Sequence, residues 1–131
     1  NILYMIKRGE LAKGFREKLL LSYFAGLFRS TRFGVSEAHG KGAAMQINRF
    51  LEEGAATFGA DGKFKVDFDK LEASIGRLVH DICMIQHAGD KAGAEALLAK
   101  YGVMSEPMKK ALGGLDDIPI DLRPIYPVAG E

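Results

Sequence analysis

The chain has 131 residues, of which 47% are hydrophobic and 27% are charged, and its formal net charge is +1. These values are typical of a globular domain with a hydrophobic core, and they exclude a disordered or collagen-like chain. The longest apolar run, residues 19–28, is broken by Ser22 and Gly26 and is too short to cross a bilayer, so we expect no membrane partner.

Residues 1–6 read as an element that is already under way, because the chain opens on Asn1 and continues with apolar residues. We therefore expect residues 1–131 to be a single helical subdomain, the C-terminal fragment of a larger protein. Residues 10–29 carry apolar side chains at spacings of four in two neighbouring rows, which predicts a helix with a wide apolar face. Such a face needs cover on more than one side, which indicates partner segments upstream in the same parent chain.

A second helix is predicted from Ser36, a residue type that caps helices, to Gly54, a residue type that ends them. Residues 55–58 and 63–66 are short extended runs on either side of an Asp-Gly turn. This pattern predicts a small β-hairpin between the second helix and the rest of the chain.

The clearest helix of the chain follows the hairpin. Asp67 or Asp69 caps it, and apolar residues then recur at steps of three and four until Gly89. Asp90 caps a shorter helix, which Gly102 closes. Both segments are therefore predicted to be helices with acidic side chains at their N-termini.

Ser105 opens a last predicted helix, with proline in its first turn, and two glycines at residues 113–114 end it. The tail, residues 117–127, mixes apolar residues with prolines and is predicted to be an extended strap over the helices. The predicted fold class is therefore mainly α: a helical domain of four or five helices with one short β-hairpin and an extended C-terminal strap.

His39 and Lys41 are the first candidates for a functional site. They lie beside Gly40 and Gly42 on what otherwise reads as a helix, where each glycine costs about 1 kcal/mol relative to alanine. Glycines remove side-chain cover and let another group approach the backbone, which is the layout of a site wall rather than of a well-packed core helix. A histidine in such a wall can donate a hydrogen bond to a developing oxyanion, as donors do in acyl transfer.

The sequence has no complete catalytic motif: there is no zinc-peptidase helix with paired histidines, no phosphate-binding loop and no serine-nucleophile elbow. His80, Cys83 and His87 project from one side of a predicted helix and could hold zinc, but no fourth ligand is evident. The favoured alternative is a buried cysteine between ordinary surface histidines. We predict no metal site and no cofactor within the chain. Cys83 is the only cysteine, which favours a reducing, cytoplasmic location.

Charge is unevenly distributed along the chain. Residues 1–50 carry nine Lys/Arg and three Asp/Glu, whereas residues 51–131 carry nine and fourteen. The asymmetry indicates either an anion-facing surface, with Arg29 and Arg32 near His39, or two halves that attract each other, which is the simpler interpretation. Nucleic acid is not an expected partner, because its binding needs a denser basic stripe with aromatic or motif support.

Several short motifs follow one another along the chain. They are Glu-Ala-His at residues 37–39, Phe-Leu-Glu-Glu-Gly at 50–54, Val-Asp-Phe-Asp-Lys-Leu at 66–71, Gly-Asp-Lys-Ala-Gly-Ala at 89–94 and Tyr-Gly-Val at 101–103. Their order resembles the C-terminal helical region of the dipeptidyl peptidase III family of zinc metallopeptidases, over roughly residues 20–105. The tail resembles the ending of bacterial relatives described as Nudix or zinc-dependent hydrolases.

The resemblance implies that zinc is a cofactor of the parent protein and that its ligands lie upstream of this chain. It also implies that His39 points into the cleft between two lobes, where it holds the substrate and polarises the scissile carbonyl. Typical peptidases of the family place arginines at positions that are Ala43 and Asn48 here, with Arg49 next to the second. We therefore predict that His39 is catalytic and that Lys41, Asn48 and Arg49 bind substrate.

The predicted function is the C-terminal part of a zinc-dependent, peptidase-like hydrolase that acts on a peptide or another small substrate. The chain would form part of the substrate cleft wall without the metal-binding motifs. One alternative is a non-catalytic helical interaction or regulatory domain whose apolar face binds a partner. Another is a scaffold region of a Nudix-linked protein.

Overall fold

The computed structural model describes residues 2–12, 14–115 and 117–119. These residues form six helices and one two-stranded hairpin, which confirms the mainly α fold class. In chain order the elements are α1 (Ile2–Lys7), α2 (Phe15–Thr31), α3 (Ala38–Glu52), β1 (Ala56–Phe58), β2 (Phe64–Val66), α4 (Phe68–Ala88), α5 (Lys91–Tyr101) and α6 (Glu106–Gly113). The sequence predicted four or five helices, so the predicted number was too low. Most of the predicted C-terminal strap, residues 120–127, lies outside the described residues.

The start of α2 corrects one prediction. The helix begins at Phe15 rather than at residue 10, and Leu11 therefore lies before it. Two glycines account for the difference. Gly9 has a φ of +76°, a backbone conformation that interrupts a helix, and Gly14 at the N-cap has no side chain with which to begin one earlier.

The caps of α4 and α5 are as the sequence predicted. Asp67 accepts a hydrogen bond from the backbone N–H of Lys70 at 3.0 Å, and Asp90 accepts one from that of Gly93 at 2.8 Å. The prediction that Ser36 caps α3 is wrong. Glu37 is the N-cap, in an extended conformation, and its side chain makes no capping hydrogen bond.

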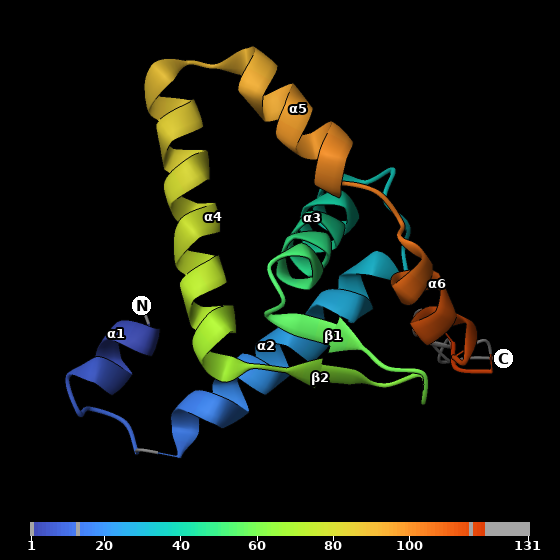
Figure 1. Ribbon diagram of the computed structural model, residues 1–131, viewed down its shortest axis with the longest axis horizontal. Coiled ribbons are helices and arrows are strands. Elements are labelled where there is room, and N and C mark those ends of the chain that lie inside the picture. The colour runs from blue at the N-terminus through green and yellow to red at the C-terminus, as the bar shows by residue number, and fades with distance from the viewer. Residues whose placement is uncertain (1, 13, 116, 120–131) are drawn as a thin grey trace, which may run out of the picture.

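Figure 1 shows α2 and α3 packed at the centre of the molecule, with the hairpin lying across them and α4 along one side. β1 and β2 are antiparallel, and their register pairs Ala56 with Val66 and Phe58 with Phe64. α5 runs from the far end of α4 back towards α3. The hydrophobic core lies between α2, α3, the hairpin and α4, and α6 adds one residue to it. Its buried residues are Leu20, Phe24, Leu27, Ala43, Ala44, Ile47, Phe50, Ala55, Ala56, Leu71 and Met108.

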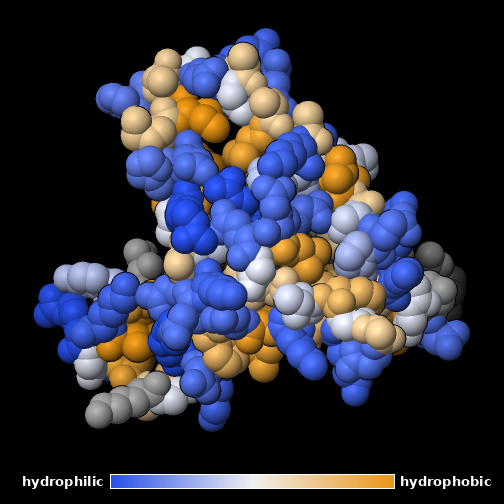
Figure 2. Space-filling view, viewed as in Figure 1, coloured by the Kyte–Doolittle hydropathy of each residue, from blue (hydrophilic) through white to orange (hydrophobic). Residues whose placement is uncertain are grey.

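α2 is buried mainly on one side, whereas its apolar rows predicted cover on more than one. Leu20 and Phe24 are almost fully buried, but Leu21 is 53% exposed. Figure 2 shows further apolar side chains at the surface, near α1 and where α4 meets α5. Among the described helices, none is long and apolar enough to span a membrane.

Candidate functional site

A backbone contact between two glycines fixes the start of α3. A Cβ atom placed on Gly40 would lie only 1.8 Å from the carbonyl oxygen of Gly34 and 3.4 Å from that of Ser30. Gly34 itself has a φ of +91°, which lets the loop after α2 turn back over α3. Gly40 is therefore a buried close-packing residue, and the interpretation of both glycines as an open site wall is wrong for it. Of the two glycines, Gly42 has open space: no atom of the described residues outside its own helix backbone lies within 4 Å of its Cβ position.

The same contact places His39 at a surface hollow of about 460 Å³. The residues that line the hollow come from the end of α2, the loop after it and the start of α3: Arg29, Ser30, Phe33, Glu37, His39 and Gly40. His39 is exposed, so its imidazole is open to a ligand. Around it the hollow is lined by an arginine, a glutamate, a serine and a phenylalanine, residue types that can bind the carbonyl and the side chain of a small substrate.

Lys41 does not line this hollow. Residues two positions apart on a helix do not share a face, so the lysine leaves α3 on another side than His39. Its aliphatic stem lies against Gly102 at the end of α5, where a Cβ would approach the lysine Cγ to 2.7 Å. The structure therefore separates the two candidate residues, and the substrate-binding role of Lys41 stays a prediction.

Asn48 ties α3 to the end of α5. Its amide nitrogen donates hydrogen bonds to the backbone carbonyl oxygens of Tyr101 and Val103, each at 2.8 Å. These carbonyls lie on either side of Gly102, just where α5 ends. The two amide hydrogens of Asn48 are thereby used to close a helix, and its predicted role in binding substrate is untested.

We expect Asn48→Ala to lower the free energy of unfolding by about 1–3 kcal/mol, because two backbone carbonyls, that of Tyr101 part-buried and that of Val103 exposed, lose their donor. Asn48→Asp is the matched control, since it keeps the size of the side chain but cannot donate. It should destabilise the protein at least as much. Urea unfolding of the three proteins is the measurement. An alanine variant as stable as the wild type would contradict the structural role and leave the amide available to a substrate.

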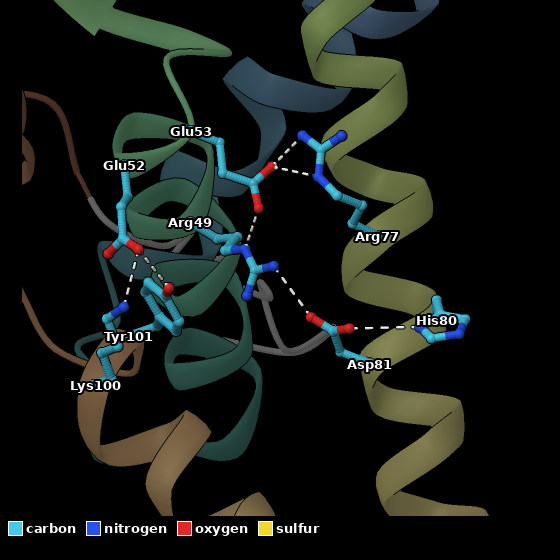
Figure 3. Close-up of polar contacts among 8 residues, drawn as sticks. All are labelled: Arg49, Glu52, Glu53, Arg77, His80, Asp81, Lys100 and Tyr101. Carbon is cyan, nitrogen blue, oxygen red and sulfur yellow. Dashed lines mark hydrogen bonds and ion pairs between the residues drawn. The ribbon is translucent and has the colours of Figure 1, made fainter.

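Arg49 is the centre of a polar network between α3, α4 and α5 (Figure 3). Its guanidinium pairs with the Glu53 carboxylate and lies 3.0 Å from that of Asp81 on α4, and it covers the ring of Tyr101 at 5.5 Å from the centroid. Its side chain is only 16% exposed. Arg77 of α4 binds the second oxygen of Glu53. Arg49 thus holds three helices together in this structure, and its predicted contact with substrate is untested.

A second group of the network lies on the other side of α3 (Figure 3). The Glu52 carboxylate accepts hydrogen bonds from the Lys100 ammonium and the Tyr101 hydroxyl, both at 2.9 Å. Lys100 also lies over the Tyr101 ring, 4.6 Å from its centroid. The hydrogen bonds from Lys100 and Tyr101 lower the pKa of Glu52 below its usual value. This carboxylate therefore stays charged over a wide pH range and anchors α5.

Ion pairs also join the basic first part of the chain to its acidic second part. Arg16 lies 2.7 Å from Glu72 and 2.8 Å from Asp69, and Lys7 lies 3.0 Å from the second oxygen of Glu72. These contacts support the simpler interpretation of the charge asymmetry, that the two halves attract each other. Arg32 does not join His39 either, because it donates to the backbone oxygens of residues 115 and 118.

Known proteins share this arrangement of helices. The sequence matches no protein-family model. It is 44% identical over 128 residues to Nudix hydrolase 3 of Arabidopsis thaliana, an alignment that covers 96% of this chain and 17% of that protein. The structure of DPP III from Caldithrix abyssi superposes with a TM-score of 0.90 at 37% identity, over 97% of this chain and 24% of that one.

A second solved structure, dipeptidyl-peptidase III from Corallococcus sp. strain EGB, has a TM-score of 0.89 at 42% identity and covers 95% of this chain and 23% of that one. The chain is similar in fold to one segment of dipeptidyl-peptidase III. It spans a quarter or less of the length of each of these relatives. The resemblance noted in the sequence therefore extends to the backbone over nearly the whole chain.

The side chains present do not fit a zinc site. Among residues 2–12, 14–115 and 117–119, no three His, Cys, Asp or Glu side chains lie together in a way that could hold a metal ion. Cys83 is exposed, which corrects the prediction that it is buried. His80 instead lies 3.5 Å from the Asp81 carboxylate at the edge of the network (Figure 3).

Phe33 is the residue of the hollow that the sequence did not reveal. It lies in the loop after α2 and its ring is 52% exposed. The sequence does carry one signal, since a glycine directly follows both Phe33 and His39. In the structure these two glycines, Gly34 and Gly40, are in backbone contact. Nothing in a short sequence window shows that these glycines are in contact, so the ring and the imidazole could not be placed together.

Glu53 gives the network a pH dependence. Burial opposes ionisation of its carboxylate, but hydrogen bonds from Arg77 and Arg49 outweigh this effect and lower the pKa of Glu53 to about 2. The ordinary value is 4.5. A pKa that is lower in the folded state stabilises the protein above the ordinary value, and this contribution is lost as the pH falls towards the folded-state value.

We therefore expect the Glu53 carboxylate to contribute about 2 kcal/mol to the free energy of unfolding at neutral pH. This is less than the full pKa shift implies, because Arg77 is exposed and water screens its charge. The contribution should disappear between about pH 4.5 and pH 2. The measurement is the difference in unfolding free energy between the wild type and Glu53→Gln at pH 7, 5, 4 and 3. A difference that stays constant over this range would show that the carboxylate is not held in its charged form.

Proposed function

We propose that this chain is part of a zinc-dependent, peptidase-like hydrolase of the dipeptidyl-peptidase III kind, and that it forms part of the wall of the substrate cleft. The observation that carries the proposal is the similarity to two dipeptidyl-peptidase III structures, which extends over at least 95% of the chain at 37% and 42% identity. Because the chain spans about a quarter of those proteins, the rest of the active site would come from other parts of the same polypeptide.

The role proposed for this segment is electrostatic. His39 is exposed at the hollow, and its imidazole can donate a hydrogen bond to the oxygen of a scissile carbonyl as negative charge develops there. The backbone contact of Gly40 with Gly34 fixes the helix turn that carries His39, so the donor is held in place before substrate arrives. Zinc is a cofactor of the parent in this proposal, and its ligands would lie outside the described residues.

The partners proposed are a peptide or another small substrate and the upstream segments of the same polypeptide. A largely apolar hollow of about 620 Å³ between α1, α2 and α4 supports the second. Its lining residues are Ile2, Leu3, Leu19, Leu20, Tyr23 and Ile75. Burial of these side chains by another part of the protein would be favourable.

A cytoplasmic location is proposed because Cys83 is a free, exposed thiol, which suits a reducing compartment.

The similarity to Nudix hydrolase 3 favours one other candidate function. Since the chain aligns with only 17% of that protein, it would serve as a helical scaffold without chemistry of its own. The polar network of Arg49, which joins three helices, agrees with such a role. The two proposals differ in what they require of His39. The peptidase needs its imidazole for turnover, whereas a scaffold does not.

A peptidase assay of the full-length protein that contains this chain distinguishes the two. Synthetic tetrapeptides are incubated with the purified protein, with and without a zinc chelator, and the products are identified by mass spectrometry. Release of dipeptides that the chelator abolishes and added zinc restores supports the peptidase. A zinc-loaded protein that releases no product from any peptide would contradict it and support the scaffold.

A further inference from the structure

We propose that Phe33 determines substrate specificity at the His39 hollow by taking an apolar, preferably aromatic, side chain of a peptide next to its scissile bond. The inference rests on the proposed function and names the chemistry that the hollow selects. It starts from the position of Phe33: this residue and His39 line the same hollow, and Phe33 is 52% exposed although it belongs to a loop packed against α3.

The loop that carries Phe33 is held rigidly against α3. The carbonyl oxygen of Gly34 lies where a side chain on Gly40 would begin, so the two backbones touch directly. Arg32, on the other side of Phe33, donates to the backbone oxygens of Leu115 and Ile118 beyond α6. The loop is therefore held in place on both sides of Phe33. An exposed ring on a rigid loop is preorganised, because it loses little conformational entropy when a ligand binds.

The surroundings of the ring select the class of ligand. Three polar residues, Arg29, Ser30 and Glu37, also line the hollow, together with Phe33 and His39. Polar side chains of this kind can form hydrogen bonds with a peptide backbone, whereas the ring of Phe33 offers a flat apolar surface to one side chain. Aromatic rings pack against each other more favourably than against a small side chain. A volume of about 460 Å³ holds one large side chain together with its peptide units.

The experiment compares tetrapeptides that carry phenylalanine or glycine on either side of the scissile bond, with the full-length protein as enzyme. The quantity measured is the ratio of kcat/KM for the phenylalanine and glycine peptides. Phe33→Ala is expected to lower this ratio about tenfold at one of the two positions, through a higher KM for the phenylalanine peptide. Phe33→Leu should keep most of the selectivity. Phe15→Ala removes an exposed ring, 39% accessible, at the other end of α2 and should change nothing.

The outcomes separate this inference from the function on which it rests. Loss of turnover in His39→Ala together with an unchanged ratio in Phe33→Ala would overturn the specificity role alone. The same would follow if Phe33→Ala lowered kcat/KM equally for both peptides, or if it unfolded the protein, because the ring would then be a packing residue. Failure of the zinc-loaded wild-type protein to cleave any of these peptides would overturn the proposed function and the inference with it.

Discussion

Replacing His39 with alanine is expected to lower the turnover of peptide substrates by the full-length protein about a hundredfold or more. The reason is that one preorganised hydrogen-bond donor to a developing oxyanion has an effect of this size when it is lost. The same change should lower the free energy of unfolding by less than about 1 kcal/mol, because the side chain is exposed and lies at the start of a helix. A large loss of turnover with little loss of stability distinguishes a catalytic from a packing role.

His87→Ala is the matched control, since His87 is an exposed histidine at the end of α4 and does not line the hollow. Steady-state kinetics of the three proteins, at equal zinc content, and their thermal unfolding provide both readouts. Unchanged turnover in His39→Ala would show that the imidazole takes no part in catalysis. A stability loss that matches the loss of activity would make it a structural residue.

Local features of the fold could be read from the sequence because their causes are local. The acidic caps at Asp67 and Asp90 bond to backbone groups three residues away, and the hairpin turns at Asp61 and Gly62, where Gly62 has a φ of +73°. Apolar spacing likewise predicted α4 to its last turn. Each of these signals lies within a window of a few residues, so no knowledge of the tertiary structure is needed to find it.

The candidate site depends on contacts between residues far apart in the chain, and such contacts could not be inferred from the sequence. Asn48 and Arg49 look like binding residues beside His39, yet their partners are the end of α5, 53 residues on, and Asp81 of α4, 32 residues on. Lys41 shares a short motif with His39 but leaves the helix on another side. Proximity in sequence therefore suggested one site where the structure shows a hollow and a separate network.

The prediction of a wide apolar face on the first long helix shows a different limit. Its two rows of apolar residues are real, and Leu20 and Phe24 are buried, but Leu21 is exposed and apolar hollows remain along the helix. The pattern reports how much apolar surface the helix offers. It does not say which part of the polypeptide covers that surface, and in this fold the described residues cover one side of it.

Gly40→Ala is expected to lower the free energy of unfolding by about 3 kcal/mol. The added methyl group would meet the carbonyl oxygen of Gly34 at 1.8 Å, and because that atom belongs to the backbone the loop after α2 would have to move as a whole. The displaced loop carries Phe33, and the altered helix turn carries His39. The variant should therefore also bind and turn over substrate poorly, although residue 40 itself has no side chain with which to touch it.

Gly42→Ala is the comparison that makes this prediction sharp. It adds the same methyl group to the same helix two residues later, where nothing among the described residues lies within 4 Å. Alanine is the better helix former, so this variant should be stabilised by up to about 1 kcal/mol. If the backbone contact exists, urea unfolding should show a lower free energy of unfolding for Gly40→Ala and a higher one for Gly42→Ala, each relative to the wild type. Equal effects would mean that the loop does not lie on α3, and the hollow beside His39 would then lose its physical basis, because that contact holds the loop of Phe33 against the helix turn of His39.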